Sequence, residues 1–408
     1  MLRDTRLLVD LDAISHNARE LVAFLDATSP EWATRPRIAA VLKANAYGLG
    51  ARRVAPVLAA AGIDLFAVAC LSEALELRRV LPAAALLVMG HTPTEQFPEL
   101  LRADIRATIF DEAQAAALSA AARALGKRAR IHVKIDSGMN RLGLKTGPVA
   151  LETLLALAHN PGLEPEGIFT HLALADEASD RAQFDRFMAL VEAAAAKGLR
   201  FRYRHICDSI GLARYPEFRL DLVRPGAILW GVVPQRSPLL EGGYPGKGGF
   251  LLPFSFRSRI SRLRRLEEGE GVGYDHSWKA PAGGALLATV PAGYADGYPR
   301  RLSNAGEVLI RGRRAPVVGL VCMDQLTVDA SSVPEVAEGD EVLLFGAGEG
   351  GGIDSGIPLL ETSKRAATNR NDLIASISRR VPRVYCLGGE DAGHVDYVLG
   401  EETTGGTA

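Results

Sequence analysis

The chain has 408 residues, of which 48% are hydrophobic and 23% charged, and its formal net charge is −1. This length predicts two domains, or one large and one small, and the composition suffices for a large buried core. The near-neutral charge argues against a nucleic acid or an anionic membrane as a partner, and we expect neither.

The first residues, MLRDTRLLVDLDAISHN, carry charges inside their apolar patch, which is not typical of a secretory signal. No uncharged apolar stretch reaches the roughly 18 residues that a membrane-spanning helix needs. The four cysteines, at positions 70, 207, 322 and 386, are widely separated and show no CxxC or CxxH spacing. We therefore expect a cytoplasmic protein with buried free thiols, no disulfide framework and no metal site.

The chain opens with a weakly alternating stretch over residues 1–12, which predicts a short strand. Asp12 can cap the helix that follows over 13–25, and Asp111 can cap a later one. Apolar runs then predict buried strands at 38–42, 65–69, 85–89, 105–110, 131–135, 167–171, 203–207 and 222–229. Helical segments alternate with them at 51–61, 72–80, 93–102, 112–125, 148–158 and 180–197.

Strands that alternate with amphipathic helices predict a parallel sheet. About eight such units in roughly 200 residues indicate an α/β fold in which the sheet closes into a TIM-like (β/α)8 barrel. A doubly wound open sheet is the alternative. The chain has no glycine-rich dinucleotide loop after its first strand, and this weighs against the open sheet.

The sequence pattern changes after about Gly242, from strands that alternate with helices to short strands with turns. The stretch GGYPGKGG over 242–249 predicts a linker, and residues 254–345 then read as short strands with turns, including a hairpin at VLIRGRRAPVVG. Residues 357–388 add a helix and a last strand, and the tail beyond Gly400 is expected to fray. We therefore predict a barrel over residues 12–242 and a predominantly β domain over 243–400, which the opening strand 1–11 joins.

Lys43 directly follows the first barrel strand. Burial would depress the pKa of this lysine, because the charged form loses its hydration. A partly neutral amine is what Schiff-base chemistry with an aldehyde requires. The alternative is that Lys43 merely extends from a core strand into water.

Barrel enzymes carry their sites at the carboxyl ends of the strands, and polar residues recur there in this chain. They are Lys43 and Tyr47, then Lys134, Asp136 and Arg141, then His171 and Asp176, then Ser209, and finally Arg224, Gly226 and Ala227. Ser209, Tyr47 and the backbone N–H groups near Gly226 could cradle a phosphate. A lysine, a phosphate cup and an arginine in place of an acidic partner for a pyridine ring suggest pyridoxal 5'-phosphate.

Seven segments together resemble the alanine racemases, which are fold-type III pyridoxal-phosphate enzymes. They are VLKANAYGLG, KIDSGMNRLG, FTHLALAD, DLVRPG, VGYD, GYADGY and VCMDQ, and the resemblance runs from about residue 7 to 388. It implies a homodimeric isomerase that interconverts L-alanine and D-alanine and supplies D-alanine for bacterial peptidoglycan.

The resemblance also implies roles for residues. Lys43 would carry the cofactor and act as the base on the D face of the substrate, and Tyr274 of the other subunit would act on the L face. The cofactor would be held by Lys43, Tyr47, His171, Ser209, Arg224, Gly226 and Ala227. Arg141, Met323, Asp324 and Tyr294 would line the substrate pocket, and Lys134 matches a lysine that is often carbamylated.

Free tyrosine has a pKa of about 10, so a cation such as a neighbouring arginine or histidine must lower the pKa of Tyr274 if it is to act as a base. Taken alone, Tyr274 and Tyr294 could also be ordinary turn tyrosines beside glycine.

Two positions depart from the family pattern. Asn371 stands where a tyrosine is usual, and Asp208 stands where many relatives have asparagine. Because a shorter amide leaves more room and adds a polar contact, we expect additional serine racemase activity through Asn371.

Three other functions stay open at this point. A fold-type III decarboxylase needs an acidic partner for the pyridine nitrogen, whereas DLVRPG offers Arg224. A non-catalytic pyridoxal-phosphate carrier is typically a lone barrel, whereas this chain has a second domain with Tyr274. A racemase with a broader range of amino acids is the third alternative.

Overall fold

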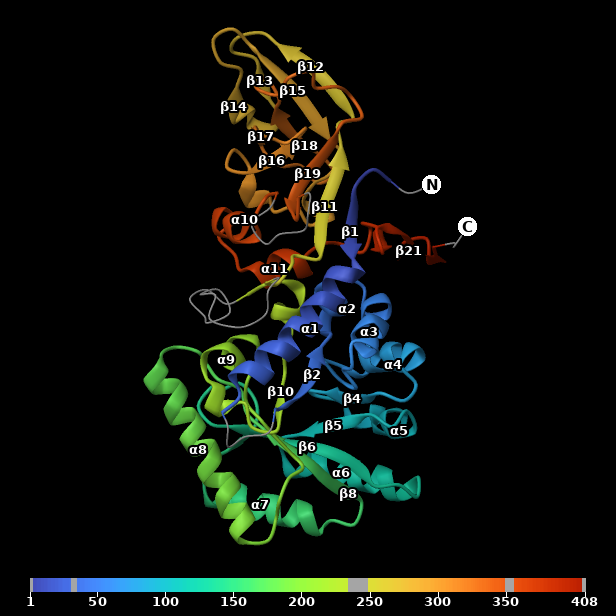
Figure 1. Ribbon diagram of the computed structural model, residues 1–408, viewed down its shortest axis with the longest axis vertical. Helices are drawn as coiled ribbons and strands as arrows, with labels where there is room; N and C mark the ends of the chain where they lie inside the picture. Colours follow the sequence, from blue (N-terminus) through green and yellow to red (C-terminus); the bar gives the residue numbers. More distant parts are fainter. Residues whose placement is uncertain (1–2, 31–34, 234–248, 349–355, 406–408) are drawn as a thin grey trace.

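The computed structural model describes residues 3–30, 35–233, 249–348 and 356–405. It has a barrel with surrounding helices at one end of its long axis and a β domain at the other (Figure 1). The fold class predicted from the sequence is thus confirmed. Residues 242–248 of the predicted linker and the domain boundary at 242/243 lie outside the described residues.

Eight parallel strands form the barrel, and each overlaps one of the predicted apolar runs, although only Leu222–Val223 of the run 222–229 is strand and Ala227–Trp230 is a 3-10 helix. They are β2 (Arg37–Val41), β3 (Leu65–Val68), β4 (Ala85–Val88), β5 (Arg106–Ile109), β6 (Ala129–Asp136), β8 (Leu163–Phe169), β9 (Tyr203–His205) and β10 (Leu222–Val223), in the spatial order β10-β2-β3-β4-β5-β6-β8-β9. A short strand, β7 (Leu144–Lys145), pairs with β6. The amides of Asp221 and Arg224 donate to the carbonyls of Arg204 and Cys207, and these bonds join β10 to β9 and close the barrel.

Helices surround the barrel, and their sequences explain where they begin. They are α1 (Leu11–Thr28), α3 (Ala51–Ala60), α4 (Leu71–Val80), α5 (Phe97–Arg102), α6 (Glu112–Ala124), α7 (Pro148–His159), α8 (Glu177–Ala196) and α9 (Ser209–Arg214). Asp111 caps α6 as predicted, by accepting from the amide of Gln114. The cap of α1 is Asp10 instead of Asp12, because the helix begins two residues earlier and the Asp10 carboxylate reaches the amide of Ala13.

The β domain contains one large sheet in the order β17-β16-β19-β11-β1-β20-β21-β22. Its strands are β1 (Arg6–Asp10), β11 (Phe254–Arg259), β16 (Glu307–Ile310), β17 (Arg313–Pro316), β19 (Glu341–Gly346), β20 (Arg383–Leu387), β21 (Glu390–Asp396) and β22 (Glu401–Thr404). The opening strand β1 pairs antiparallel with β11 and parallel with β20. The first and last parts of the chain therefore lie side by side (Figure 1).

Smaller elements complete the molecule. They are the sheet of β12 (Arg262–Leu266), β15 (Ala285–Val290) and β18 (Leu326–Asp329), the pair β13 (Gly271–Val272) and β14 (Trp278–Lys279), and the helices α2 (Lys43–Tyr47), α10 (Leu359–Arg365) and α11 (Arg370–Ala375). Short 3-10 helices are η1 (Thr94–Gln96), η2 (Pro216–Phe218), η3 (Ala227–Trp230), η4 (Tyr274–His276), η5 (Tyr294–Asp296) and η6 (Arg300–Leu302). Within the described ranges, the helices lack the length and apolar content that crossing a lipid bilayer requires.

Two expectations were wrong, one about the carboxyl-terminal tail and one about the burial of the cysteines. Residues 401–404 do not fray: they form β22, which pairs with β21. All four cysteines are free thiols, but only Cys207 is buried and Cys70 is exposed.

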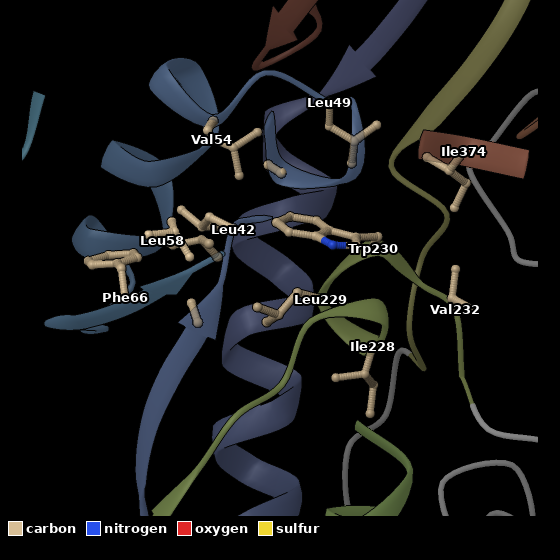
Figure 2. Packing of buried hydrophobic residues seen from close by; sticks show 14 of the residues in the cluster. Leu42, Leu49, Val54, Leu58, Phe66, Ile228, Leu229, Trp230, Val232 and Ile374 are labelled. Carbon is tan, nitrogen blue, oxygen red and sulfur yellow. The ribbon is translucent and has the colours of Figure 1, made fainter. Parts of the chain in front are cut away.

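One apolar cluster joins the barrel to the β domain beneath the segment that follows β2. Figure 2 shows Trp230 in the middle of this cluster, with Leu42 and Leu49 from that segment and Ile374 from α11 around it. All four side chains are fully buried. The segment that carries Lys43 therefore rests on a packed base to which both parts of the chain contribute.

Candidate active site

Lys43 begins a turn whose backbone is unusual for L-amino acids. The next four residues, Ala44 to Tyr47, have φ between 53° and 57°, so α2 is a left-handed turn. Such a conformation costs roughly 1–2 kcal/mol per residue for L-amino acids, and surrounding contacts must hold it. The turn leaves Lys43 exposed in the single chain. The expectation that burial primes this amine was therefore wrong for the isolated subunit.

Polar atoms of Tyr47, Ser209, Gly226 and Ile228 gather beside this turn, and this group is called the cup below. Ser209 Oγ accepts hydrogen bonds from the amides of Gly226 (3.0 Å) and Ile228 (3.3 Å). A Cβ atom at position 226 would clash with Tyr47 Oη, so glycine is required for this close approach. Burial, together with the Asp208 carboxylate, raises the pKa of Tyr47 to about 12, and its phenol stays protonated as a donor.

Donors that converge on a glycine-lined space suit a phosphate group. The structure brings together the four residues predicted for this task, because Tyr47 follows β2, Ser209 begins α9, and Gly226 and Ala227 begin η3. The residues present therefore fit the phosphate of pyridoxal phosphate.

Arg224 is buried in the middle of the same face. It donates to His205 Nδ1 (2.8 Å) and to the carbonyls of Thr170 and Ile206 (both 2.9 Å). Burial lowers its pKa to about 10, which leaves it a cation at neutral pH. Across the described residues, Arg224 forms no ion pair with a carboxylate. It can therefore offer a positive hydrogen-bond donor to a pyridine nitrogen, as predicted.

Four basic side chains lie near enough to His171 to act on its charge. Its Nδ1 lies 3.3 Å from Arg224 Nη2. Burial lowers its pKa to about 2, helped by the charges of Arg224, Lys134, Arg141 and Lys43. His171 is therefore neutral in the single chain. The sequence predicted that a cationic arginine or histidine lowers the pKa of Tyr274. Because His171 is neutral here, only an arginine can supply that charge.

Lys134 is buried in an environment that disfavours its charge. Its Nζ lies 4.4 Å from the centre of the Phe169 ring. Burial lowers its pKa well below the ordinary value, and Arg224 and Arg141 add to this, whereas Asp136 opposes them. The predicted group of Lys134, Arg141, His171 and Arg224 is thus brought together at one end of the barrel.

A chain of buried polar groups continues from Arg224 into the barrel, and reasoning from the sequence missed it. His205 Nε2 lies 2.8 Å from His132 Nδ1, and His132 Nε2 lies 3.5 Å from Glu166, which Arg106 also bonds. Because Arg224 can only donate, His205 must accept at Nδ1 and donate from Nε2 to His132. The visible signal was a histidine inside each of two apolar runs, 131–135 and 203–207.

The buried histidines predict that the protein becomes less stable as the pH falls. Burial lowers the pKa of His132, His171 and His205, whereas in the unfolded chain each binds a proton near pH 6.5. Below that pH the unfolded state binds more protons, so the free energy of unfolding should fall by up to about 1.4 kcal/mol per pH unit and histidine. Urea unfolding between about pH 7.5 and 5.5 measures this.

Replacing the exposed His91 by asparagine should leave that pH dependence unchanged. A stability that stays constant between these two pH values would contradict the prediction of three buried neutral imidazoles.

Three of the residues predicted in the β domain are exposed in the single chain. The strands β13 and β14 flank Tyr274 at the far end of that domain (Figure 1). Tyr274, Met323 and Tyr294 are 69%, 53% and 40% exposed. The amide of Tyr294 donates to the Cys322 carbonyl, so the loops of Tyr294 and Met323 lie together.

The two remaining predicted residues differ in their surroundings. Asp324 pairs with Arg380 at 2.7 Å, near the loop of Met323. Asn371 is exposed on α11. That helix packs on the Lys43 turn, since a Cβ atom at Gly48 would lie 3.1 Å from the Ile374 carbonyl. The helix that carries Asn371 therefore packs against the Lys43 turn, whereas Asp324 belongs to the exposed group of the β domain.

Comparisons with known proteins agree over nearly the whole chain. The family models named "Alanine racemase, N-terminal domain" and "Alanine racemase, C-terminal domain" match residues 9–234 and 254–385. The alanine racemase of Desulforamulus reducens is 37% identical over 382 residues, which cover 92% of this chain and 97% of that relative.

Solved structures agree as well. The alanine racemase of Bacillus anthracis with bound L-Ala-P has a TM-score of 0.86 at 29% identity, and the match covers 98% of this chain and 99% of that one. The alanine racemase of Bartonella henselae with covalently bound pyridoxal phosphate has a TM-score of 0.79 at 28% identity, over 94% and 99% of the two chains.

Proposed function

The chain belongs to the alanine racemase family, and on this premise we propose that it interconverts L-alanine and D-alanine with two proton-transfer groups, Lys43 and Tyr274, on opposite sides of the substrate α-carbon. Membership makes it an isomerase that depends on pyridoxal phosphate. The observation that carries the proposed chemistry is the buried Arg224, which faces the site without a carboxylate partner in the described part of the chain.

The barrel residues would hold the cofactor. Tyr47, Ser209, Gly226 and Ala227 would take its phosphate, and Lys43 would hold its aldehyde carbon. Arg224 would donate to the pyridine nitrogen, and His171 would pack beside the ring. When bound, pyridoxal phosphate supplies an aldehyde that joins amines and a ring that withdraws electrons from the substrate α-carbon.

The chain's own part in the reaction is proton transfer. Racemisation needs an acid and a base on opposite faces of a planar carbon, and an amine and a phenol can exchange these roles. Lys43 Nζ would take or return the proton on the D face, and Tyr274 Oη on the L face. Arg141 would bind the substrate carboxylate, and its charge would favour the ionised phenol of Tyr274.

Tyr274 would come from a second copy of the chain. The exposure of Tyr274, Met323 and Tyr294 supports this, because aromatic and methionine side chains that gather on a surface are typical of interfaces. Asp324 would complete this group. We propose a homodimer in which residues 12–242 bind the cofactor and residues 243–400, with strand 1–11, complete the partner's site.

We propose that Lys134 is carbamylated. Its lowered pKa, caused first by burial, favours the uncharged amine, which is the form that reacts with carbon dioxide. The product would replace the Lys134 amine near Arg141 by an anion that can orient Arg141. We also propose that the D-alanine serves bacterial peptidoglycan.

The asparagine at position 371 leads us to propose serine as a second substrate. L-serine should be racemised at a measurable rate, because an amide beside the Lys43 turn is shorter than a tyrosine and can bond a hydroxyl. The variant Asn371→Tyr should lower kcat/KM for serine relative to alanine by about tenfold. Chiral chromatography of both amino acids measures this ratio, with alanine as the internal control. Equal rejection of serine by both proteins would show that Asn371 does not set substrate choice.

A single incubation separates this function from its rivals. L-alanine in deuterated water should exchange its α-proton and lose its optical rotation. A decarboxylase would release carbon dioxide, and a carrier would do neither. Arg224 argues against the decarboxylase, because within the described residues it forms no ion pair with a carboxylate that could take its place beside the pyridine nitrogen.

A further inference from the structure

The left-handed turn after Lys43 is held by side chains that are distant in the sequence. On the barrel side, the carboxylate of Glu73 accepts from the amides of Ala44 (2.6 Å) and Ala69 (2.9 Å). Asn45 then uses both ends of its amide: Oδ1 accepts from the amide of Ala51 (2.8 Å), and Nδ2 donates to Tyr397 Oη (2.8 Å). The middle of the turn is thus bonded to a residue near the end of the chain.

The exit from the turn is held by strand β20. Arg383 Nε donates to the Gly48 carbonyl at 2.9 Å, and Tyr385 Oη donates to the Leu49 carbonyl at 3.1 Å. Both side chains are fully buried or nearly so. A Cβ atom at Gly50 would clash with Tyr385 Oη, so this approach requires glycine. From Asn45 onward, the β20–β21 region therefore supplies the side-chain contacts that fix the turn.

Tyr397 is itself held rigidly. Arg383 Cζ and Arg379 Cζ lie 5.5 and 5.6 Å from the centre of its ring, which is the range of cation–π contacts. Asp396 accepts from the amides of Val398 (3.0 Å) and Leu399 (3.1 Å) and so fixes the turn that presents Tyr397. The matched family regions end at residue 385, so Tyr397 lies outside them.

We propose that Tyr397 is a positioning residue for Lys43, acting through Asn45 to hold the left-handed turn that aims the Lys43 amine; this rests on the proposed role of Lys43. A left-handed run of L residues reverts to more favourable backbone angles unless its surroundings oppose this. Without the tyrosine hydroxyl, Asn45 Nδ2 loses its acceptor, and the middle of the turn loses its hydrogen bond to Tyr397. The Lys43 amine should then be less well oriented toward an aldehyde in the cup.

The test is Tyr397→Phe, which removes the hydroxyl and keeps the ring between the two arginines. In the apoprotein, the condensation of Lys43 with the aldehyde of pyridoxal phosphate, which releases water, is followed by its absorbance. We expect it to slow by about two- to tenfold, the factor that one neutral hydrogen bond is worth. Amide hydrogen exchange across residues 43–50 should accelerate by a similar factor, with no cofactor present.

Two further variants separate positioning from general loss of stability. Asn45→Ala removes the donor of the same bond, so the double variant should be no slower than the slower single one. Tyr215→Phe removes another tyrosine hydroxyl bond, to Asp180 at 2.8 Å on the barrel. It should change neither the condensation rate nor the exchange of the turn, even where its Tm falls as far as that of Tyr397→Phe.

Wild-type condensation and exchange rates in Tyr397→Phe, or additive effects in the double variant, would overturn the proposal. Borohydride reduction followed by peptide mapping identifies the lysine that has condensed. A label on a lysine other than Lys43 in the wild type would overturn the proposed function and, with it, the role of Tyr397 toward Lys43. A label on Lys43 with an unaffected Tyr397→Phe would overturn only the positioning role.

Discussion

Replacing Lys43 by alanine is expected to lower kcat for alanine racemisation about 10⁴-fold or more, in both directions. A single positioned acid or base contributes about 10²–10⁴-fold. Lys43 would in addition carry the cofactor, so its loss removes a covalent anchor as well as a proton-transfer group. Chiral chromatography of L- and D-alanine after incubation measures the rate from each side.

The matched control is Lys197→Ala. Lys197 is an exposed lysine that caps the carboxyl end of α8, away from the cup. This variant should keep wild-type kcat and KM. A Lys43→Ala protein that retained even a tenth of the wild-type kcat would remove this residue from the proposed chemistry. The two variants together distinguish loss of one amine from a general effect of lost charge.

The second large effect concerns the source of Tyr274. Lys43→Ala and Tyr274→Phe should each be nearly inactive alone. After the two are mixed in equal amounts and allowed to exchange subunits, about one quarter of the wild-type activity should return. Half of the dimers are then mixed, and each mixed dimer has one site with an intact lysine from one subunit and an intact tyrosine from the other.

The structure of the single chain explains why we expect Tyr274 to act in the site of a second subunit. Tyr274 is 69% exposed, and Figure 1 shows the strands β13 and β14, which flank it, at the far end of the β domain, whereas α2 lies where that domain meets the barrel. A phenol that has to reach the Lys43 site must therefore come from another copy. A mixture that stays inactive after verified subunit exchange would contradict shared sites. Coexpression with two affinity tags provides a purified mixed dimer as the control.

The barrel could be predicted because its strands are buried on both faces. Such strands appear as continuous apolar runs, and each of the eight runs overlaps a strand. Short elements could not be predicted in this way. The turn α2 and the helix α9 contain too few residues to show a period, and α2 has left-handed backbone angles that Ala44, Ala46 and Tyr47 do not favour.

The candidate site was predicted in part. The cup formed by Tyr47, Ser209 and Gly226 follows from the rule that sites lie at the carboxyl ends of barrel strands. The exposure of Lys43 did not follow, because it depends on a turn that is held by Asn45 and Tyr397. Nor did the neutral state of His171, which burial and the nearby basic side chains produce together.

The amino-acid sequence by itself determined the order of the barrel strands, the residues at their carboxyl ends and the seven segments that resemble one family. These are local patterns of apolarity and spacing, and a linear chain displays them directly. Only the tertiary structure decided which charges meet, such as those of Lys134 and Arg224, and which contacts hold the turn after Lys43. These depend on burial and on pairs such as Asn45 and Tyr397, which lie far apart in the chain until folding brings them into contact.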